Sequence, residues 1–220
     1  MHSRFGFWAA IAALVTSLAY GVAQIAQIAG LLHDPWDRIL IFAPSLALAP
    51  SFVVAMAALY AVAPPTRRAL AVSALALAIM YGAFVSIVYV TQLSVVIPHE
   101  IQGDRTTYAV FACCGHGQFT TGVDLLGYTT MSLSTLLAGF IFAPAGPHRW
   151  TRRWFIANGL LAPFLLGQLV WPGLIYVGVL WLITFPVSMI GLARAFSGRD
   201  DGTVEIHARG LDARVRLDEV

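Results

Sequence analysis

The sequence predicts an all-α membrane protein: a bundle of about six transmembrane helices with both termini in the cytoplasm. Of its 220 residues, 59% are hydrophobic and 11% are charged, whereas typical soluble domains have about 45–50% apolar and 25% charged residues. A soluble core cannot bury that much apolar surface. Because about 20 apolar residues cross a bilayer, the chain is long enough for six crossings and short loops in one domain.

The charged residues exclude two classes of function. The formal net charge is only +2, and nucleic-acid binding requires a basic face or stripe, so we expect no nucleic-acid partner. The basic residues are all Arg. Without Lys, the chain cannot form a retinal Schiff base or use another lysine-based covalent mechanism.

The first apolar run could be mistaken for a secretory signal, because it follows a short basic start from Met1 to Arg4. It continues from Phe5 to Leu32, which is too long for the apolar region of a signal and long enough to cross a membrane. The sequence therefore predicts a first transmembrane helix.

Further apolar runs follow, separated by segments rich in proline, glycine or charge. The predicted helices are 6–30, 39–63, 68–97, 120–142, 153–171 and 173–195. The run from Trp154 to Phe196 is nearly continuous, but as one helix it would be about twice the membrane thickness, so we divide it at Pro172. Inside helices we expect prolines to cause kinks, because neighbouring helices satisfy the freed carbonyls. These prolines are Pro44, Pro50, Pro163 and Pro186.

The distribution of Arg predicts the orientation, because short cytoplasmic loops carry the basic excess. With the N-terminus inside, the cytoplasmic segments contain Arg4, Arg67, Arg68, Arg149, Arg152, Arg153, Arg194 and Arg199. The opposite side has only Arg38 and Arg105.

The segment 197–220 is rich in charge and lacks an apolar run, so we predict a cytoplasmic tail. Alternating residues at 204–207 and 215–218 are compatible with a small hairpin, but two isolated strands are marginally stable in water. The tail is therefore predicted to be disordered or a small hairpin. A protein partner that contacts this tail would make the chain a structural or regulatory subunit, which is one interpretation of its function.

Polar side chains lie mainly in the outer half of the predicted helices, at helical spacing. Because a polar group that faces lipid is costly, these side chains should face one another or water inside the bundle. We predict a ligand-binding pocket for a small or amphiphilic molecule, formed by Gln24, Gln27, Gln92, Asp124, Tyr128 and Gln168. The alternative is that they only form interhelical hydrogen bonds. The expected function is binding, sensing or transport of that ligand.

Asp124 is the one acidic residue inside a predicted helix. An intramembrane carboxylate indicates a functional site, yet Asp124 lies one turn from the outer end. It is either a solvated acid stabilised by the helix dipole or a buried group suited to proton coupling.

The longest loop, from Pro98 to Phe119, contains several metal-compatible side chains on the oxidising side of the membrane. Their spacing matches no zinc or copper signature. We expect Cys113 and Cys114 to be free thiols, with a reducible disulfide as the alternative. An alternative function is a membrane-embedded enzyme that acts on lipid or quinone, with His99, Glu100 and His116 as acid, base or metal ligands.

Motifs of common enzyme classes are absent. The sequence has no GxGxxG, no lysine phosphate-binding loop, no HExxH and no GxSxG, and no His lies inside a predicted helix to ligate haem. We therefore expect no cofactor and favour a non-enzymatic protein.

Two stretches, residues 89–98 and residues 123–133 from Val123 through Leu133, resemble segments of uncharacterised bacterial multi-pass membrane proteins. The resemblance implies a location in the bacterial inner (plasma) membrane, with the lipid bilayer as partner. It implies no activity and no site residue.

Overall fold

The computed structural model describes residues 3–198, and these residues form helices and loops without a strand. The helices are α1 (Arg4–Ile28), α2 (Trp36–Val62), α3 (Arg68–Thr91), α4 (Ile97–Ile101), α5 (Phe119–Gly139), α6 (Arg149–Gly159), α7 (Ala162–Gly167), α8 (Ile175–Gly178) and α9 (Trp181–Phe196). A π-helical stretch, Gln92–Val96, joins α3 to α4, and short 3₁₀ turns cover Pro65–Arg67, Ala109–Phe111 and Pro172–Leu174. The predicted tail after residue 198 lies outside the described residues.

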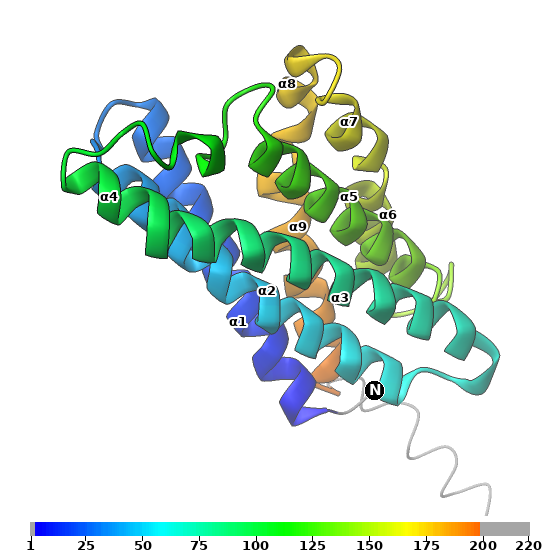
Figure 1. Cartoon of the computed structure of the whole chain (residues 1–220). Helices are drawn as coiled ribbons and strands as arrows, with labels where there is room; N and C mark the ends of the chain where they lie inside the picture. The colour runs from blue at the N-terminus through cyan, green and yellow to red at the C-terminus, as the bar shows by residue number, and fades with distance from the viewer. Residues whose placement is uncertain (1–2, 199–220) are drawn as a thin grey trace, which may run out of the picture.

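The helices form an elongated bundle in which α3 runs diagonally across the whole length (Figure 1). The connection from α1 to α2, the helix α4 and the start of α5 lie at one end, which we call the outer end. The chain begins at the opposite end, where the backbone N–H of Ser3 donates to the carbonyl of Phe196 at 3.2 Å. The first and last described helices are therefore joined at this inner end.

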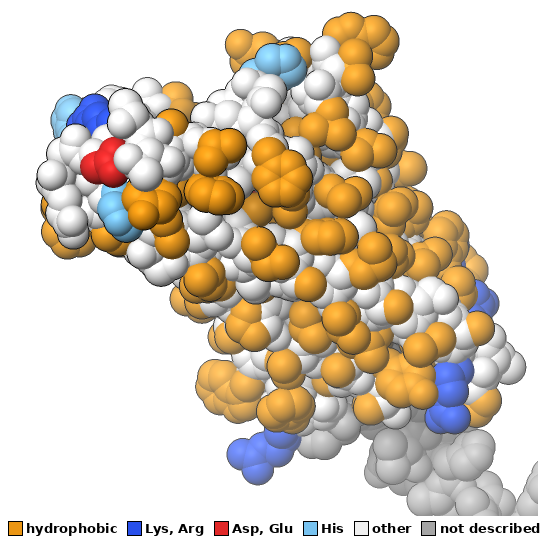
Figure 2. Space-filling view, in the orientation of Figure 1, with side chains coloured by type: hydrophobic (Ala, Val, Ile, Leu, Met, Phe, Trp, Pro, Cys, Tyr) orange, Lys and Arg blue, Asp and Glu red, His pale blue; other side chains and the backbone are white. Residues whose placement is uncertain are grey.

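Within residues 3–198, four helical segments are long and apolar enough to cross a membrane, which confirms the all-helical fold and fits a membrane protein. They are Arg4–Ile28, Trp36–Val62, Pro65–Ile101 and Pro172–Phe196. Apolar side chains cover the visible body of the molecule, whereas charged side chains gather at its two ends (Figure 2). Exposed side chains such as Val22 and Ile87 would be unfavourable in water over so large an area. The surface thus indicates a lipid environment.

The region predicted as one helix over 153–171 differs in the structure. It consists of α6 and α7, which are separated at Leu160 and Leu161, and α6 starts earlier, at Arg149. Pro163 lies in the first turn of α7, where its missing N–H breaks no helical hydrogen bond, so it begins a helix and does not kink one. Pro44 and Pro50 lie inside α2, and Pro186 inside α9, as expected.

Small residues allow the helices to approach closely, as in other membrane bundles. A Cβ atom added to Gly159 of α6 would lie 2.7 Å from Cα of Leu136 on α5, and one added to Gly127 of α5 would lie 2.7 Å from Val85 Cγ1 on α3. On α1, Ala10 and Ala13 are completely buried. These contacts fix the positions of the helices that surround the outer end.

A buried amide links three helices in the middle of the bundle. Asn158 Nδ2 of α6 donates to Thr135 Oγ1 of α5 at 2.9 Å, and Asn158 Oδ1 accepts from Thr184 Oγ1 of α9 at 2.8 Å. Both ends of the amide are therefore satisfied by side chains. Asn158 is an example of the interhelical hydrogen bonds that the sequence predicts as the alternative to a pocket.

Candidate functional site

A cavity of about 1170 Å³ lies in the outer half of the bundle. Its wall comes from α1, α2, α5 and the α7–α9 region, and the segment 113–119 of the long loop also lines it. Polar lining residues include Tyr20, Gln24, Gln27, Asp124, Tyr128 and Gln168, and apolar ones include Phe42, Leu165, Trp181 and Leu182. The cavity therefore combines apolar walls with a few hydrogen-bonding groups, as small-molecule sites do.

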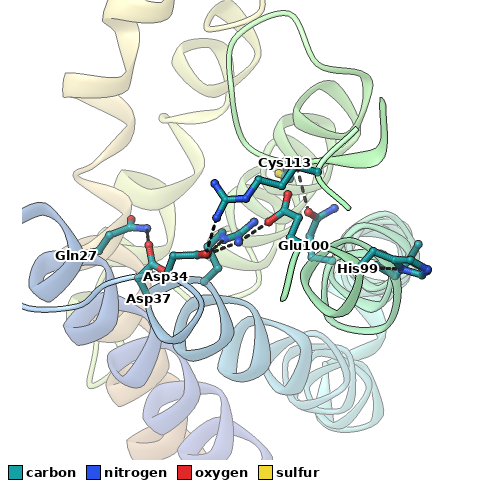
Figure 3. A network of polar contacts seen from close by, with 10 residues as sticks. Gln27, Asp34, Asp37, His99, Glu100 and Cys113 are labelled. Carbon is teal, nitrogen blue, oxygen red and sulfur yellow. Dashed lines mark hydrogen bonds and ion pairs between the residues drawn. The ribbon is translucent and has the colours of Figure 1, made fainter. Parts of the chain in front are cut away.

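Most of the predicted pocket residues share this cavity. Gln24, Gln27, Asp124, Tyr128 and Gln168 line it, although they come from helices far apart in the sequence. Gln24 Nε2 donates to Gln27 Oε1 at 3.0 Å, and Gln27 Nε2 donates to Asp37 Oδ2 at 2.9 Å, as Figure 3 shows for the second bond. The two glutamines form a short polar chain along the wall made by α1.

Gln92, also predicted for the pocket, does not line the cavity. Its side chain is completely buried, and its amide is used by the backbone of the long loop. Nε2 donates to the carbonyl of Phe111 at 2.7 Å, and Oε1 accepts from the N–H of Cys113 at 3.1 Å. Gln92 is therefore placed to hold the loop that covers one side of the cavity.

Asp124 lies in the second turn of α5 and is half-buried against the cavity. Its Oδ1 atom is inaccessible to solvent and has no hydrogen-bond partner among the described residues. A buried carboxylate oxygen normally has a donor. Asp124 thus brings a carboxylate into the cavity lining, with one of its two oxygens left without a donor among the described residues.

An aromatic group forms the cavity floor. Tyr89 donates its hydroxyl hydrogen to the Tyr128 hydroxyl at 3.0 Å, and the rings of Tyr128 and Trp181 meet edge to face at 5.0 Å. The Trp181 indole nitrogen is buried and has no partner among the described residues. Trp181 and Phe42 were missed by the sequence-based prediction, because an apolar side chain in an apolar helix gives no signal of its own.

Cys113 and Cys114 form a disulfide with each other, so the prediction of free thiols is wrong. Cys113 is half-buried against the core, while Cys114 is exposed. Their sulfur atoms and a carboxylate oxygen of Asp124 all lie within 4.8 Å of one another. As a disulfide the sulfurs are not thiolate ligands, so the cluster as it stands is not a metal site.

The alternative site residues His99, Glu100 and His116 are not brought together into a cluster of metal-ligating atoms in the described chain. His99 Nδ1 lies 2.7 Å from the carbonyl of Val95, and its ring contacts the Tyr108 ring at an interplanar angle of 42°. Glu100 pairs with Arg38, which also pairs with Asp34 (Figure 3). Glu100 thus joins α4 to the start of α2, whereas His99 contacts its own helical segment and the long loop.

The exposed turn after α4 contains a carboxylate held by backbone amides. Asp104 Oδ1 accepts from the N–H groups of Thr107 at 3.0 Å and Thr106 at 3.2 Å. The hydrogen bond from the Thr107 N–H is the main reason that the pKa of Asp104 lies below its ordinary value. This turn is ordered by local bonds and lies away from the cavity lining.

The described chain is thus a helical bundle with candidate membrane spans and an amphiphilic cavity near one end. No protein-family model, no curated protein and no solved structure matches it. The resemblance of residues 89–98 and 123–133 to bacterial membrane proteins therefore stays a prediction.

Proposed function

We propose that this protein is a bacterial inner-membrane protein that binds a small amphiphilic ligand in the outer cavity. Its function is to sense or transport this ligand. The Asp124 carboxylate, a strong acceptor in the lining of that cavity, is the observation that carries the proposal. A ligand hydroxyl or N–H would donate to the carboxylate oxygen that faces the cavity. The proposed topology has six crossings, with both termini in the cytoplasm.

The six-crossing topology is supported by helix lengths. The segment from the start of α6 to the end of α7 (149–167) would span roughly 28 Å at 1.5 Å per residue, close to the hydrocarbon thickness of about 30 Å. α5, from Phe119 to Gly139, is similar in length. These two segments, added to the four apolar ones, make six crossings.

The orientation is supported by charge. At the inner end, Arg4, Arg67 and Arg149 lie at the starts of helices or in the turns between them, and blue side chains mark this end in Figure 2. The outer end has mixed charge, because Arg38 pairs there with Asp34 and Glu100. The excess of Arg at the inner end favours that end in the cytoplasm.

The ligand class follows from the lining. The aromatic and aliphatic walls favour a ligand with an apolar body. The amides of Gln24 and Gln168 and the carboxylate of Asp124 favour a polar group on the same ligand. Arg38 is the one Arg among the described lining residues, and it is paired with carboxylates. A neutral amphiphile therefore fits better than a phosphorylated one.

Native mass spectrometry of the gently solubilised protein tests the proposal. We expect a bound small molecule or lipid in the wild-type chain, and its loss in Asp124→Asn and in Gly122→Phe. Gly122 lines the cavity, and a Cβ added there meets nothing closer than 3.8 Å, so a larger side chain would fill the cavity without displacing backbone.

The matched control is Asp104→Asn, the same chemical change in the exposed turn outside the cavity. It should retain the wild-type ligand. A wild-type chain free of ligand, or equal occupancy in Asp124→Asn, Gly122→Phe and the control, would overturn the proposal.

A further inference from the structure

The Cys113–Cys114 disulfide belongs to the wall of the cavity, and the ligand-binding proposal does not use it. Both cysteines line the cavity. Cys114 is exposed and Cys113 is half-buried against the core. The pair thus contacts both the outer surface and the space where a ligand would bind.

The backbone around the pair is held by side chains from two helices. From α3 and its π-helical extension, Gln92 binds Phe111 and Cys113. From the first turn of α5, Thr120 donates to the carbonyl of Ala112, and Thr121 donates to the carbonyl of Gly115 at 2.8 Å. A loop anchored on both sides of two adjacent cysteines keeps the sulfurs at a fixed position in the cavity wall.

A carboxylate accompanies the sulfurs. Asp124 has an oxygen within 4.8 Å of both Sγ atoms, and its Oδ1 atom has no donor among the described residues. A carboxylate beside a dithiol can accept the proton that a thiol must lose before it reacts, because the thiolate is the reactive form. Sulfurs, base and cavity are therefore assembled in one place.

We propose that Cys113 and Cys114 form a redox site that exchanges two electrons with a quinone bound in the cavity. This inference rests on the proposed function and names the class of its ligand. In the oxidising direction, the two S–H bonds break and one S–S bond forms. The two electrons and two protons pass to the quinone, whose two carbonyl oxygens become the hydroxyls of a quinol. Asp124 accepts the proton of the first thiol to react and passes this proton to the nearer quinone oxygen.

The cavity favours a quinone over other two-electron carriers. A quinone ring is planar and neutral and its tail is apolar, which matches aromatic walls such as Phe42 and Trp181. Its carbonyls need donors, which the Gln168 amide and the Tyr128 hydroxyl can supply. Nicotinamide and flavin nucleotides carry phosphates, and the described lining offers no unpaired Arg to receive them.

The test uses the full chain in detergent under anaerobic conditions. The protein is reduced with a phosphine, freed of reductant and mixed with a short-chain benzoquinone bearing one isoprenoid unit. Quinol formation is followed by ultraviolet absorbance, and free thiols are counted by maleimide mass shifts. We expect about one quinol per chain with loss of both thiols, because a disulfide couple carries two electrons.

Variants separate the steps. Cys113→Ser and Cys114→Ser should each give no quinol above the buffer rate. Gly122→Phe, which keeps both cysteines but fills the cavity, should also give none, and Asp124→Asn should slow the reaction. Asp104→Asn should match wild type. Each variant is used only if its thermal unfolding and gel-filtration profile match those of the wild-type chain.

Binding of the same quinone to the untreated wild-type chain is measured separately. Quinone that binds without oxidising the thiols would overturn the redox site and leave the ligand-binding proposal standing. Equal quinol formation by Gly122→Phe and wild type would show that the thiols react outside the cavity, which also overturns the inference.

Discussion

Gln92 and Asp124 are both polar residues in the outer half of apolar helices, yet they have different roles in the structure. The Gln92 amide is completely buried, with both ends bonded to the backbone of Phe111 and Cys113. Asp124 faces the cavity and its Oδ1 atom has no partner among the described residues. A residue whose hydrogen bonds are all used supports the loop, whereas a carboxylate in the cavity lining is available to a ligand through the oxygen that faces the cavity.

Replacing Gln92 by Ala should lower the free energy of unfolding by about 2 kcal/mol, because it removes the two part-buried hydrogen bonds that hold the long loop. The measurement is denaturant unfolding in mixed micelles. Ser94→Ala, two residues further along the chain, is the matched control, because Ser94 is exposed and its hydroxyl bonds to the Val90 carbonyl of its own helical segment. Equal stability of the two variants would contradict the role given to Gln92.

The outer position of the polar residues could be predicted because their helical spacing is visible in the sequence. The separation of Gln92 from Gln24 and Gln168 could not, because it depends on where the loop residues Phe111 and Cys113 fold. That loop has no periodic pattern. The state of Cys113 and Cys114 was predicted wrongly for the same reason: the chain has one possible cysteine pair, and the fold of the loop decides whether its two sulfurs bond.

At the scale of single elements, close helix contacts depend on glycines. Gly159 ends α6, and a Cβ there would lie 2.4 Å from Leu136 Cβ and 2.7 Å from its Cα. The nearby backbone cannot rotate away as a flexible side chain would. Apolar periodicity predicts that a helix lies here, but not its break after Gly159, because both sides of the break are equally apolar.

Gly159→Ala should therefore destabilise the protein by about 1–3 kcal/mol, as overpacking does. Gly173→Ala is the matched control, because a Cβ at Gly173 meets nothing within 4 Å. Melting temperatures in the same detergent compare the two. A control that is destabilised as much as Gly159→Ala would show that helix packing at Leu136 is not the cause.

For the whole molecule, the distribution of charge and the length of its helices are the two features on which the proposed membrane orientation rests. Ion pairs join the loops of the outer end, where Arg38 and Arg105 both approach Asp34. At the inner end, Arg67 instead donates to the carbonyl of Phe140 at 2.8 Å. The helical membrane bundle was predictable from composition alone. The number of crossings depends on α5 and on α6 with α7, which are less apolar or interrupted.

The six-crossing topology predicts which side each loop occupies. Single cysteines at Thr106, Ala145 and Gly173, introduced in a chain without Cys113 and Cys114, are treated in intact cells with a membrane-impermeant maleimide. Thr106→Cys and Gly173→Cys should react, and Ala145→Cys should react only after the cells are opened. Reaction of Ala145→Cys and Gly173→Cys from the same side would mean that the segment from α6 to α7 does not cross.

The most direct test of the central claim is electron cryomicroscopy of the protein in discs formed from its own membranes, with no ligand added. We predict density for an amphiphile inside the cavity, with its polar group at Asp124 and Tyr128, and no such density in Gly122→Phe. A wild-type cavity that contains only water, or is closed by the surrounding side chains, would contradict the claim that this protein binds a ligand there.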